Sequence, residues 1–272
     1  ANTTGAKNTA VGQNALDSNT TANHNTAIGA QTLQANTTGF ANTAVGFNAL
    51  CTHTTGNSNT AVGDHAMRLT TTGTFNVAVG DNALCANTTA SSNVAIGRDT
   101  LFANTTGASN TAVGALALDA NTTGANNIAM GSSALGANTT GAGNTSLGNS
   151  SLAANTTASN NTAVGLFALN KVTTAHSNVA VGYKALCSHT INGLDNTAVG
   201  FQALMSSTEG FYNVGIGKNA LVNVTTGDNN IGLGRNAGAD AVRNITSGDN
   251  EIVIGDNSSG SAFIKIDWTV TS

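Results

Sequence analysis

Proline is absent from this chain of 272 residues, and charged residues make up only 8% of it, against about a quarter in an ordinary soluble domain. Aromatic residues make up 4%, which is too few to anchor a conventional large core. The nine Lys and Arg residues are dispersed and the net charge is −4, so no basic patch indicates a nucleic acid partner. No segment approaches the roughly eighteen consecutive apolar residues of a membrane span, which argues against membrane insertion.

Asparagine, threonine and glycine dominate the chain instead, and they recur with a fixed period. The segment Asn-Thr-Ala-Val-Gly returns at a constant 17-residue spacing from Gly12 to Gly182, with one residue inserted before Gly200 and four before Gly255. Fifteen copies of a unit that reads N-T-A-V-G-x-x-A-L-x-x-N-T-T-G-x-x therefore follow one another. A period of this kind is typical of solenoids and other repeat architectures. The pattern is already under way at Ala1, so we expect further residues upstream.

Each column of the repeat has a physical interpretation. Asn stands four residues before the Gly in fourteen of the fifteen copies, with Glu251 as the exception. The three residues between them are β-branched, small and apolar in turn, which is the period of two of a short β-strand. We predict that stacked Asn side chains hydrogen-bond along their column, as in cross-β ladders. The predicted ladder includes Asn8, Asn25, Asn42, Asn59, Asn76, Asn93, Asn110 and Asn127.

These columns predict an all-β fold, namely a parallel β-solenoid (β-roll) of about fifteen 17-residue coils. Each coil is expected to hold one strand at N-T-A-V and a second short strand near A-L. The density of Gly, Asn and β-branched residues disfavours helices, and the absence of Pro preserves every donor of the ladder between coils. We divide the chain into a regular solenoid, residues 1–234, and an irregular last coil with a C-terminal β cap, residues 235–272.

A 17-residue coil offers few side chains for an interior. The β-branched column of the strand is expected to point inward. The nearly constant Ala column suggests a second face, where another backbone approaches closely. We therefore expect a parallel homotrimer, with a monomeric solenoid as the alternative.

Two parts of the chain resemble known families. The N-[ST]-x-A-[VI]-G strand with its short turn resembles the head repeats of trimeric autotransporter adhesins. The longer version with N-T-T-G and A-L is similar to collar and shaft repeats of phage tail fibres. Residues 251–272 resemble the segment before the endosialidase-type intramolecular chaperone of tail fibres and tailspikes, which trimerises, assists folding and cuts itself off after a Ser. The resemblance makes Ser272 a candidate cleavage terminus, with an arbitrary boundary as the alternative.

This resemblance implies a structural and adhesive role, as the shaft or collar of a phage tail fibre that takes part in host attachment in the virion. The implied partners are further copies of the chain, other tail or fibre proteins, and a host cell-surface receptor, either a glycan or an outer-membrane component. The first alternative is the head of a trimeric adhesin on the bacterial cell surface. The second is an ice-binding solenoid, because regular Thr columns also mark ice-binding faces.

No arrangement of residues predicts catalysis, so we expect that the chain is not an enzyme and requires no cofactor. Acidic residues such as Asp64 and Asp119 occupy variable columns, usually beside turns. A glycosidase needs two carboxylates at a defined separation on one face, and short regular coils leave little wall for a groove.

The three cysteines share one column of the repeat. Cys51 and Cys85 are two coils apart, roughly 9–10 Å, which exceeds the span of a disulfide, so we expect free thiols here and at Cys187. Two Cys-x-His pairs end at His53 and His189. Eight coils separate them, so they cannot share one metal ion within a chain, and we predict no metal site.

Overall fold

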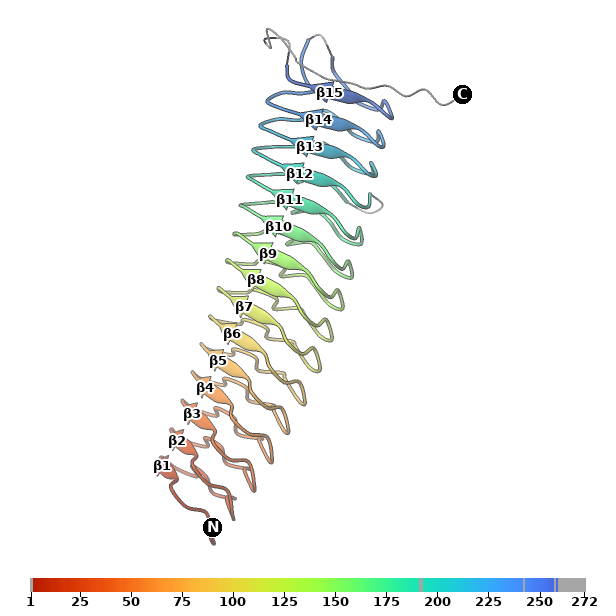
Figure 1. Cartoon of the computed structure of the whole chain (residues 1–272). Coiled ribbons are helices and arrows are strands. Elements are labelled where there is room, and N and C mark those ends of the chain that lie inside the picture. The colour runs from red at the N-terminus through yellow and green to blue at the C-terminus, as the bar shows by residue number, and fades with distance from the viewer. Residues whose placement is uncertain (1, 191–192, 242, 257, 259–272) are drawn as a thin grey trace.

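The described part of the chain is a rod of stacked coils. The computed structural model describes residues 2–190, 193–241, 243–256 and 258. These residues contain fifteen three-residue strands and no helix, and Figure 1 shows the strands stacked in chain order. The predicted parallel β-solenoid is therefore confirmed. The strands are β1 (Thr9–Val11), β2 (Thr26–Ile28), β3 (Thr43–Val45), β4 (Thr60–Val62), β5 (Val77–Val79), β6 (Val94–Ile96), β7 (Thr111–Val113), β8 (Ile128–Met130), β9 (Thr145–Leu147), β10 (Thr162–Val164), β11 (Val179–Val181), β12 (Thr197–Val199), β13 (Val214–Ile216), β14 (Ile231–Leu233) and β15 (Ile252–Ile254).

All fifteen strands belong to one parallel sheet, in which each strand pairs with the strands of the neighbouring coils. Between β7 and β8, Ala112 lies opposite Ala129 and Val113 lies opposite Met130. Residues 17 apart thus occupy equivalent positions, and each column of the sequence repeat is a row of side chains along the rod. We number the coils after their strands, so that coil 7 is residues 110–126.

A glycine follows every strand because the backbone there needs both an unusual φ and room. Gly63 has a φ of 140°, which L side chains rarely adopt. A Cβ atom added to Gly63 would also meet the carbonyl oxygen of Gly80 in the next coil. Neighbouring coils therefore approach closely at these corners, with no side chain between them.

The Ala-Leu segment forms turns instead of the second short strand that we predicted. In coil 3, Asn48 and Leu50 have left-handed φ values of 56° and 51°. The N–H of His53 donates to the Leu50 carbonyl at 3.2 Å, while the N–H of Leu50 donates to the carbonyl of Ala66 in the next coil at 3.1 Å. Left-handed φ is rare for a bulky residue such as Leu. A two-residue apolar pattern therefore cannot distinguish this turn from a strand.

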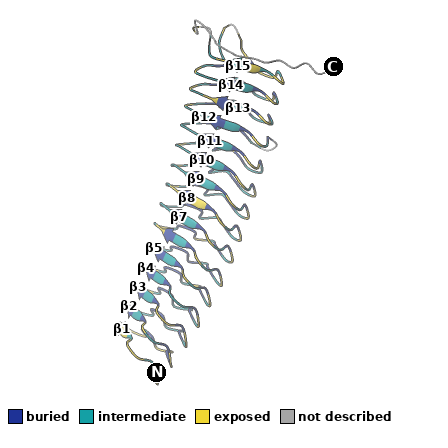
Figure 2. Cartoon of the chain, viewed as in Figure 1, coloured by how far each residue is buried: buried dark blue, intermediate teal, exposed yellow. Residues whose placement is uncertain are grey.

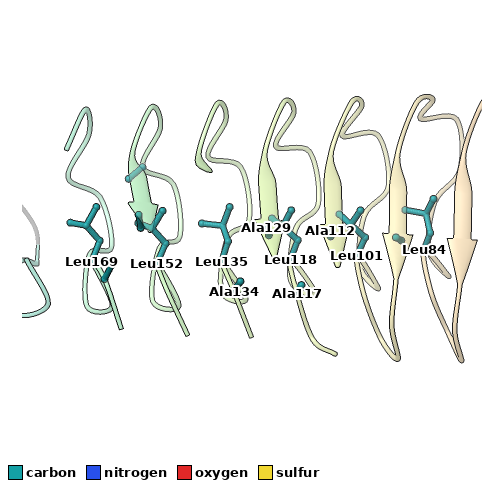
Figure 3. Close-up of a cluster of buried hydrophobic side chains, with 14 of the residues drawn as sticks. Leu84, Leu101, Ala112, Ala117, Leu118, Ala129, Ala134, Leu135, Leu152 and Leu169 are labelled. Atoms are coloured by element: carbon teal, nitrogen blue, oxygen red, sulfur yellow. The ribbon is translucent and has the colours of Figure 1, made fainter. Parts of the chain in front are cut away.

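The interior is a narrow stack of Leu and Ala side chains. Coil 7 contributes Ala112, Ala117 and Leu118, and all three are fully buried. Figure 3 shows the leucines of successive coils one beside the next along the rod, with alanines close to them. Burying a Leu side chain contributes roughly 1.5–3 kcal/mol. The Leu stack is thus the main apolar contribution to the stability of the rod.

One additional residue interrupts the repeat in coil 11. It lengthens the turn after His189, so that His189 reaches the carbonyl of the fourth following residue, Gly193, instead of the third. Residues 191–192 of this turn lie outside the described residues.

Four additional residues lengthen coil 14. Ala239 and Asn244 form an isolated antiparallel bridge within it. The sheet then resumes, because β15 pairs in parallel with β14. The predicted C-terminal β cap and the candidate cleavage terminus Ser272 fall mainly in residues 259–272, which lie outside the described residues.

Candidate interaction surface

The Asn column at the start of each strand, which we call the strand Asn column, is a hydrogen-bonded ladder inside the rod. The backbone N–H of Asn127 donates to Asn110 Oδ1 at 3.0 Å, and Asn127 Oδ1 accepts the backbone N–H of Asn144 at 2.9 Å. Asn127 Nδ2 donates to the Gly141 carbonyl at 2.9 Å. Each Asn thus satisfies backbone groups that would otherwise be buried without partners. The same backbone-to-Oδ1 bond joins Asn8, Asn25, Asn42, Asn59, Asn76, Asn93, Asn110 and Asn127 in series.

A second polar ladder, absent from our predicted ladder residues, runs through the first residue of N-T-T-G, and we call it the turn Asn column. Asn121 Nδ2 donates to Asn104 Oδ1 in the preceding coil at 2.8 Å and to the Gly124 carbonyl at 3.0 Å. This column has fifteen positions, from Asn2 before the first coil to Ile245 in coil 14, and eight of them hold Asn. Asn121 is fully buried. From the sequence alone, a polar residue before two Thr and a Gly is expected in an exposed turn.

A Thr follows each of these fifteen positions, from Thr3 to Thr246. Thr122 Oγ1 donates to the carbonyl of Thr139 in the next coil at 3.0 Å. The equivalent bond joins each Thr of this column to the next one, from Thr3 to Thr246. These hydroxyls are used within the rod, so the three polar columns stabilise the stack of coils rather than form a ligand site.

The strand side chains face the opposite way from our prediction. Ala112 of β7 is fully buried, whereas Thr111 and Val113 on either side of it are only half-buried. The Ala column is therefore not a face where another chain approaches, and the β-branched column does not point inward. The Leu stack is the reason, because a Cβ atom added to Gly215, which replaces the Ala in β13, would lie 3.1 Å from Leu204 Cγ. Only a small side chain fits between the strand and the leucine.

The outward strand residues form one continuous surface, which we call the strand face. Its first column is Thr, Val or Ile, and its last column, just before the corner glycine, is apolar in every coil. The exposed fraction is 57% for Val11, 41% for Ile28 and 43% for Met130, and exposed strand residues stand out at β8 and β15 in Figure 2. Scattered apolar residues are ordinary on a surface, but a contiguous apolar stripe indicates an interaction site.

The three cysteines are unpaired, and the surroundings of Cys51 disfavour its reactive form. Cys51, Cys85 and Cys187 are free thiols. Burial raises the pKa of the Cys51 thiol, while the positive charge of Arg68 in the next coil acts in the opposite direction. A raised pKa disfavours the thiolate, which is the nucleophilic form and the metal-binding form.

The two histidines of the Cys-x-His pairs are part of the turn Asn column. His53 and His189 are fully buried, and their Nε2 atoms lie 2.7 Å and 2.6 Å from the carbonyls of Gly56 and Gly193. Both Nδ1 atoms are buried without a hydrogen-bond partner. Burial lowers the pKa of both imidazoles. Within the described residues, no three His, Cys, Asp or Glu side chains are grouped so that they could hold a metal ion.

The described part of the chain contains no helix of the length and apolarity needed to cross a membrane. A scan against protein-family models finds no matching family, and a search of curated proteins finds no significant match. A functional conclusion therefore depends on the repeat, on the strand face and on the exposed edge formed by the two residues after each corner glycine.

Proposed function

We propose that the chain is the shaft or collar of a homotrimeric attachment fibre of the phage tail-fibre kind, with three parallel rods whose strand faces turn toward a common axis. The observation that carries the proposal is the last column of the strand face, which is apolar in all fifteen coils and partly exposed along the rod. A partner that buries it along the whole rod must match its spacing of one coil, about 4.8 Å. Another copy of the chain has that spacing.

The physical chemistry of the strand face supports assembly. Removal of apolar surface from water contributes roughly 25 cal/mol per Å², and a modest contribution from each coil is repeated along the whole rod. Closed rotational symmetry places equal coils of each copy at equal heights. The resemblance to trimeric fibres, rather than the face itself, selects three copies over two.

A shaft of this kind has a place in the virion between other tail or fibre proteins and a host cell-surface receptor, either a glycan or an outer-membrane component. The head of a trimeric bacterial adhesin is the first alternative, with the same assembly on a cell surface. The two differ in what they are attached to. A baseplate-binding segment and a self-cleaving chaperone in the full-length gene product favour the phage fibre, whereas a coiled-coil stalk and a membrane anchor favour the adhesin.

An ice-binding solenoid is the second candidate, and one observation favours it. The second Thr of N-T-T-G is exposed in ten successive coils, from Thr4 to Thr157. The strand Thr residues also face outward, which removes the objection that they belong to the interior. Thermal hysteresis of the purified chain tests this role, and its absence at millimolar concentration contradicts it.

Retention on cells tests the attachment role. Fluorescently labelled chain is incubated with a panel of bacterial strains that differ in surface polysaccharide and outer-membrane proteins. We expect saturable retention on some strains, competed by unlabelled chain, and weaker retention of Val113→Asp because a charge on the strand face opposes assembly and therefore avidity. Thr123→Asp, at an exposed position outside the strand face, is the control. If the labelled chain is retained on none of the strains, the proposal is contradicted.

A further inference from the structure

The exposed edge that follows the strand face has different chemistry along the rod. Each coil presents there the two residues after its corner glycine, which we call the edge positions. In coils 7 to 9 they hold only small, polar or aliphatic residues, from Ala115 to Ser150. In coils 11 to 13 they include two aromatic and two basic residues, namely Tyr183, Lys184, Phe201 and Lys218.

These four side chains form a continuous row. The rings of Tyr183 and Phe201 are stacked, with centroids 5.3 Å apart and planes at 25°. Lys184 Nζ lies 5.3 Å from the centroid of Tyr183, and Lys218 Nζ lies 5.7 Å from the centroid of Phe201. Cation–π contacts at these distances orient the ammonium groups beside the rings. Phe201 is nevertheless 45% exposed, so the row presents apolar ring surface to solvent.

The two ammonium groups are not neutralised within the rod. Neither Lys184 nor Lys218 forms an ion pair among the described residues. The next basic residue of the edge, Arg235, differs from them because it is paired with Asp256 at 2.8 Å. The positive charge of the row is therefore available to a ligand, in a chain whose net charge is −4.

Side-chain amides flank the row at the second edge position of the following coils. Gln202, Asn219 and Asn236 occupy this position in coils 12, 13 and 14. Asn219 Nδ2 donates to Asn236 Oδ1 at 3.2 Å, and Asn219 Oδ1 is buried without a hydrogen-bond partner, so Asn219 orders the row rather than contacting a ligand. Gln202 and Asn236 are partly exposed, and amides both donate and accept hydrogen bonds, which suits the hydroxyl groups of a sugar.

We propose that the edge of coils 11 to 13 binds an acidic polysaccharide that lies along the rod. Lys184 and Lys218 would pair with the carboxylates of two uronate residues that are not adjacent in the polysaccharide, and the exposed surface of Tyr183 and Phe201 would contact the apolar faces of the sugar rings between them. The ligand is a chain rather than a small anion because the two lysines belong to coils two apart, roughly 10 Å along the rod. This inference rests on the proposed attachment role and names the receptor class for it.

Direct titration tests the site. The full chain is titrated with a galacturonate oligosaccharide by isothermal calorimetry, and a neutral glucose oligosaccharide of equal length is the comparison ligand. We expect binding of the galacturonate oligomer only, weakened by added salt. The double variant Lys184→Ala/Lys218→Ala should bind at least about tenfold more weakly, because two charge-assisted contacts are lost, and Phe201→Ala should also bind more weakly.

The control is Lys171→Ala, which removes an exposed lysine of coil 10 outside the edge positions and should change the affinity less than about twofold. Thermal midpoints of all variants confirm that the coils remain folded. Equal binding of the neutral oligosaccharide, equal affinity of the double lysine variant, or equal binding of single-stranded DNA or anionic lipid vesicles would overturn the proposal. Cell retention that persists in the double variant would overturn this site but not the attachment role. Oligosaccharide binding without cell retention would contradict the attachment role and leave the site standing.

Discussion

The strand Asn column and the turn Asn column use the same side chain but differ in what depends on it. The strand column keeps Asn at fourteen of its fifteen positions, whereas the turn column keeps it at eight of its fifteen. In the strand column, Asn127 Oδ1 accepts the backbone N–H of Asn144 in the next coil. Loss of this side chain leaves a buried backbone donor without its acceptor, which is among the most costly changes in a protein interior.

The turn column shares its role with the strand column. The Gly124 carbonyl accepts from Asn110 Nδ2 at 2.9 Å as well as from Asn121 Nδ2 at 3.0 Å, so one donor remains when the turn Asn is replaced. What Asn121 alone provides is an acceptor and a donor for other side chains of its own column.

Coil 10 shows the consequence of such a replacement. Val172 occupies the turn column there, and the Ala175 carbonyl still accepts from Asn161 Nδ2 at 2.8 Å. Only the side-chain oxygen of Asn155 in the preceding coil is left buried without a partner. Asn is therefore kept where its side chain is the hydrogen-bond partner of a buried backbone group. It varies where loss of the side chain leaves only another side chain without a partner.

Replacement of a strand Asn should have the largest effect. Asn127→Leu, which has a similar volume, removes the acceptor for the Asn144 N–H and a donor to the Gly141 carbonyl. We expect it to lower the free energy of unfolding by about 3 kcal/mol, measured by urea denaturation. A loss under about 1 kcal/mol would contradict the proposed role of the column.

Acidification should destabilise the two coils whose turn column holds histidine. His53 and His189 have pKa values below the ordinary 6.5 because of burial, so the unfolded chain binds more protons than the folded chain as pH falls below 6.5. Stability should be unaffected by these groups above pH 6.5 and decrease below it, until the folded-state pKa is passed. Each unit of pKa difference corresponds to about 1.4 kcal/mol.

Unfolding free energies measured from about pH 7.5 to 4.5 test this slope. The double variant His53→Asn/His189→Asn restores the most frequent residue of the column and should flatten the profile. His24→Asn is the control, because His24 is exposed. An unchanged slope in the double variant would assign the acid sensitivity to other groups.

Replacement of a turn Asn should cost less than replacement of a strand Asn. Asn121→Leu removes the partners of two side-chain amides but leaves the Gly124 carbonyl with its second donor. We expect a loss of about 1–2 kcal/mol in the same urea experiment. A loss equal to that of Asn127→Leu would show that the two columns do not differ.

The reverse substitution should have the smallest effect. Val172→Asn places a donor beside the unpartnered Asn155 Oδ1 and the Ala175 carbonyl, which offsets the loss of buried apolar surface. We expect a thermal midpoint within about 2 °C of the original, equivalent to about 1 kcal/mol at this chain length. A large loss would mean that the apolar replacements of the turn column are themselves required.

The sequence was sufficient to predict the coil length, the strand positions and the parallel stacking, because every column of the repeat shows the same 17-residue spacing. It was not sufficient for the direction of the strand side chains. An alternating triplet such as Thr111, Ala112 and Val113 fits either face, and the outcome depends on Leu118 filling the interior. The left-handed φ of that leucine, 52°, likewise follows from the tertiary stack and has no local signal.

The candidate site was less accessible from the sequence than the fold. Tyr183, Phe201 and Lys218 occupy variable positions that appear scattered when read along the chain. They form a row only because 17- and 18-residue intervals bring successive coils together. The turn Asn column was similarly hidden, since burial of Asn121 depends on the neighbouring coils.

The mass of the intact chain in solution tests most directly whether the strand face is an interface between copies. Light scattering coupled to size exclusion should give the mass of three chains, each of 26.9 kDa. Val113→Asp should shift the mass toward that of one chain, whereas Thr123→Asp should not. A mass of 26.9 kDa, that of a single chain, for the unaltered protein at micromolar concentration would contradict the trimeric fibre.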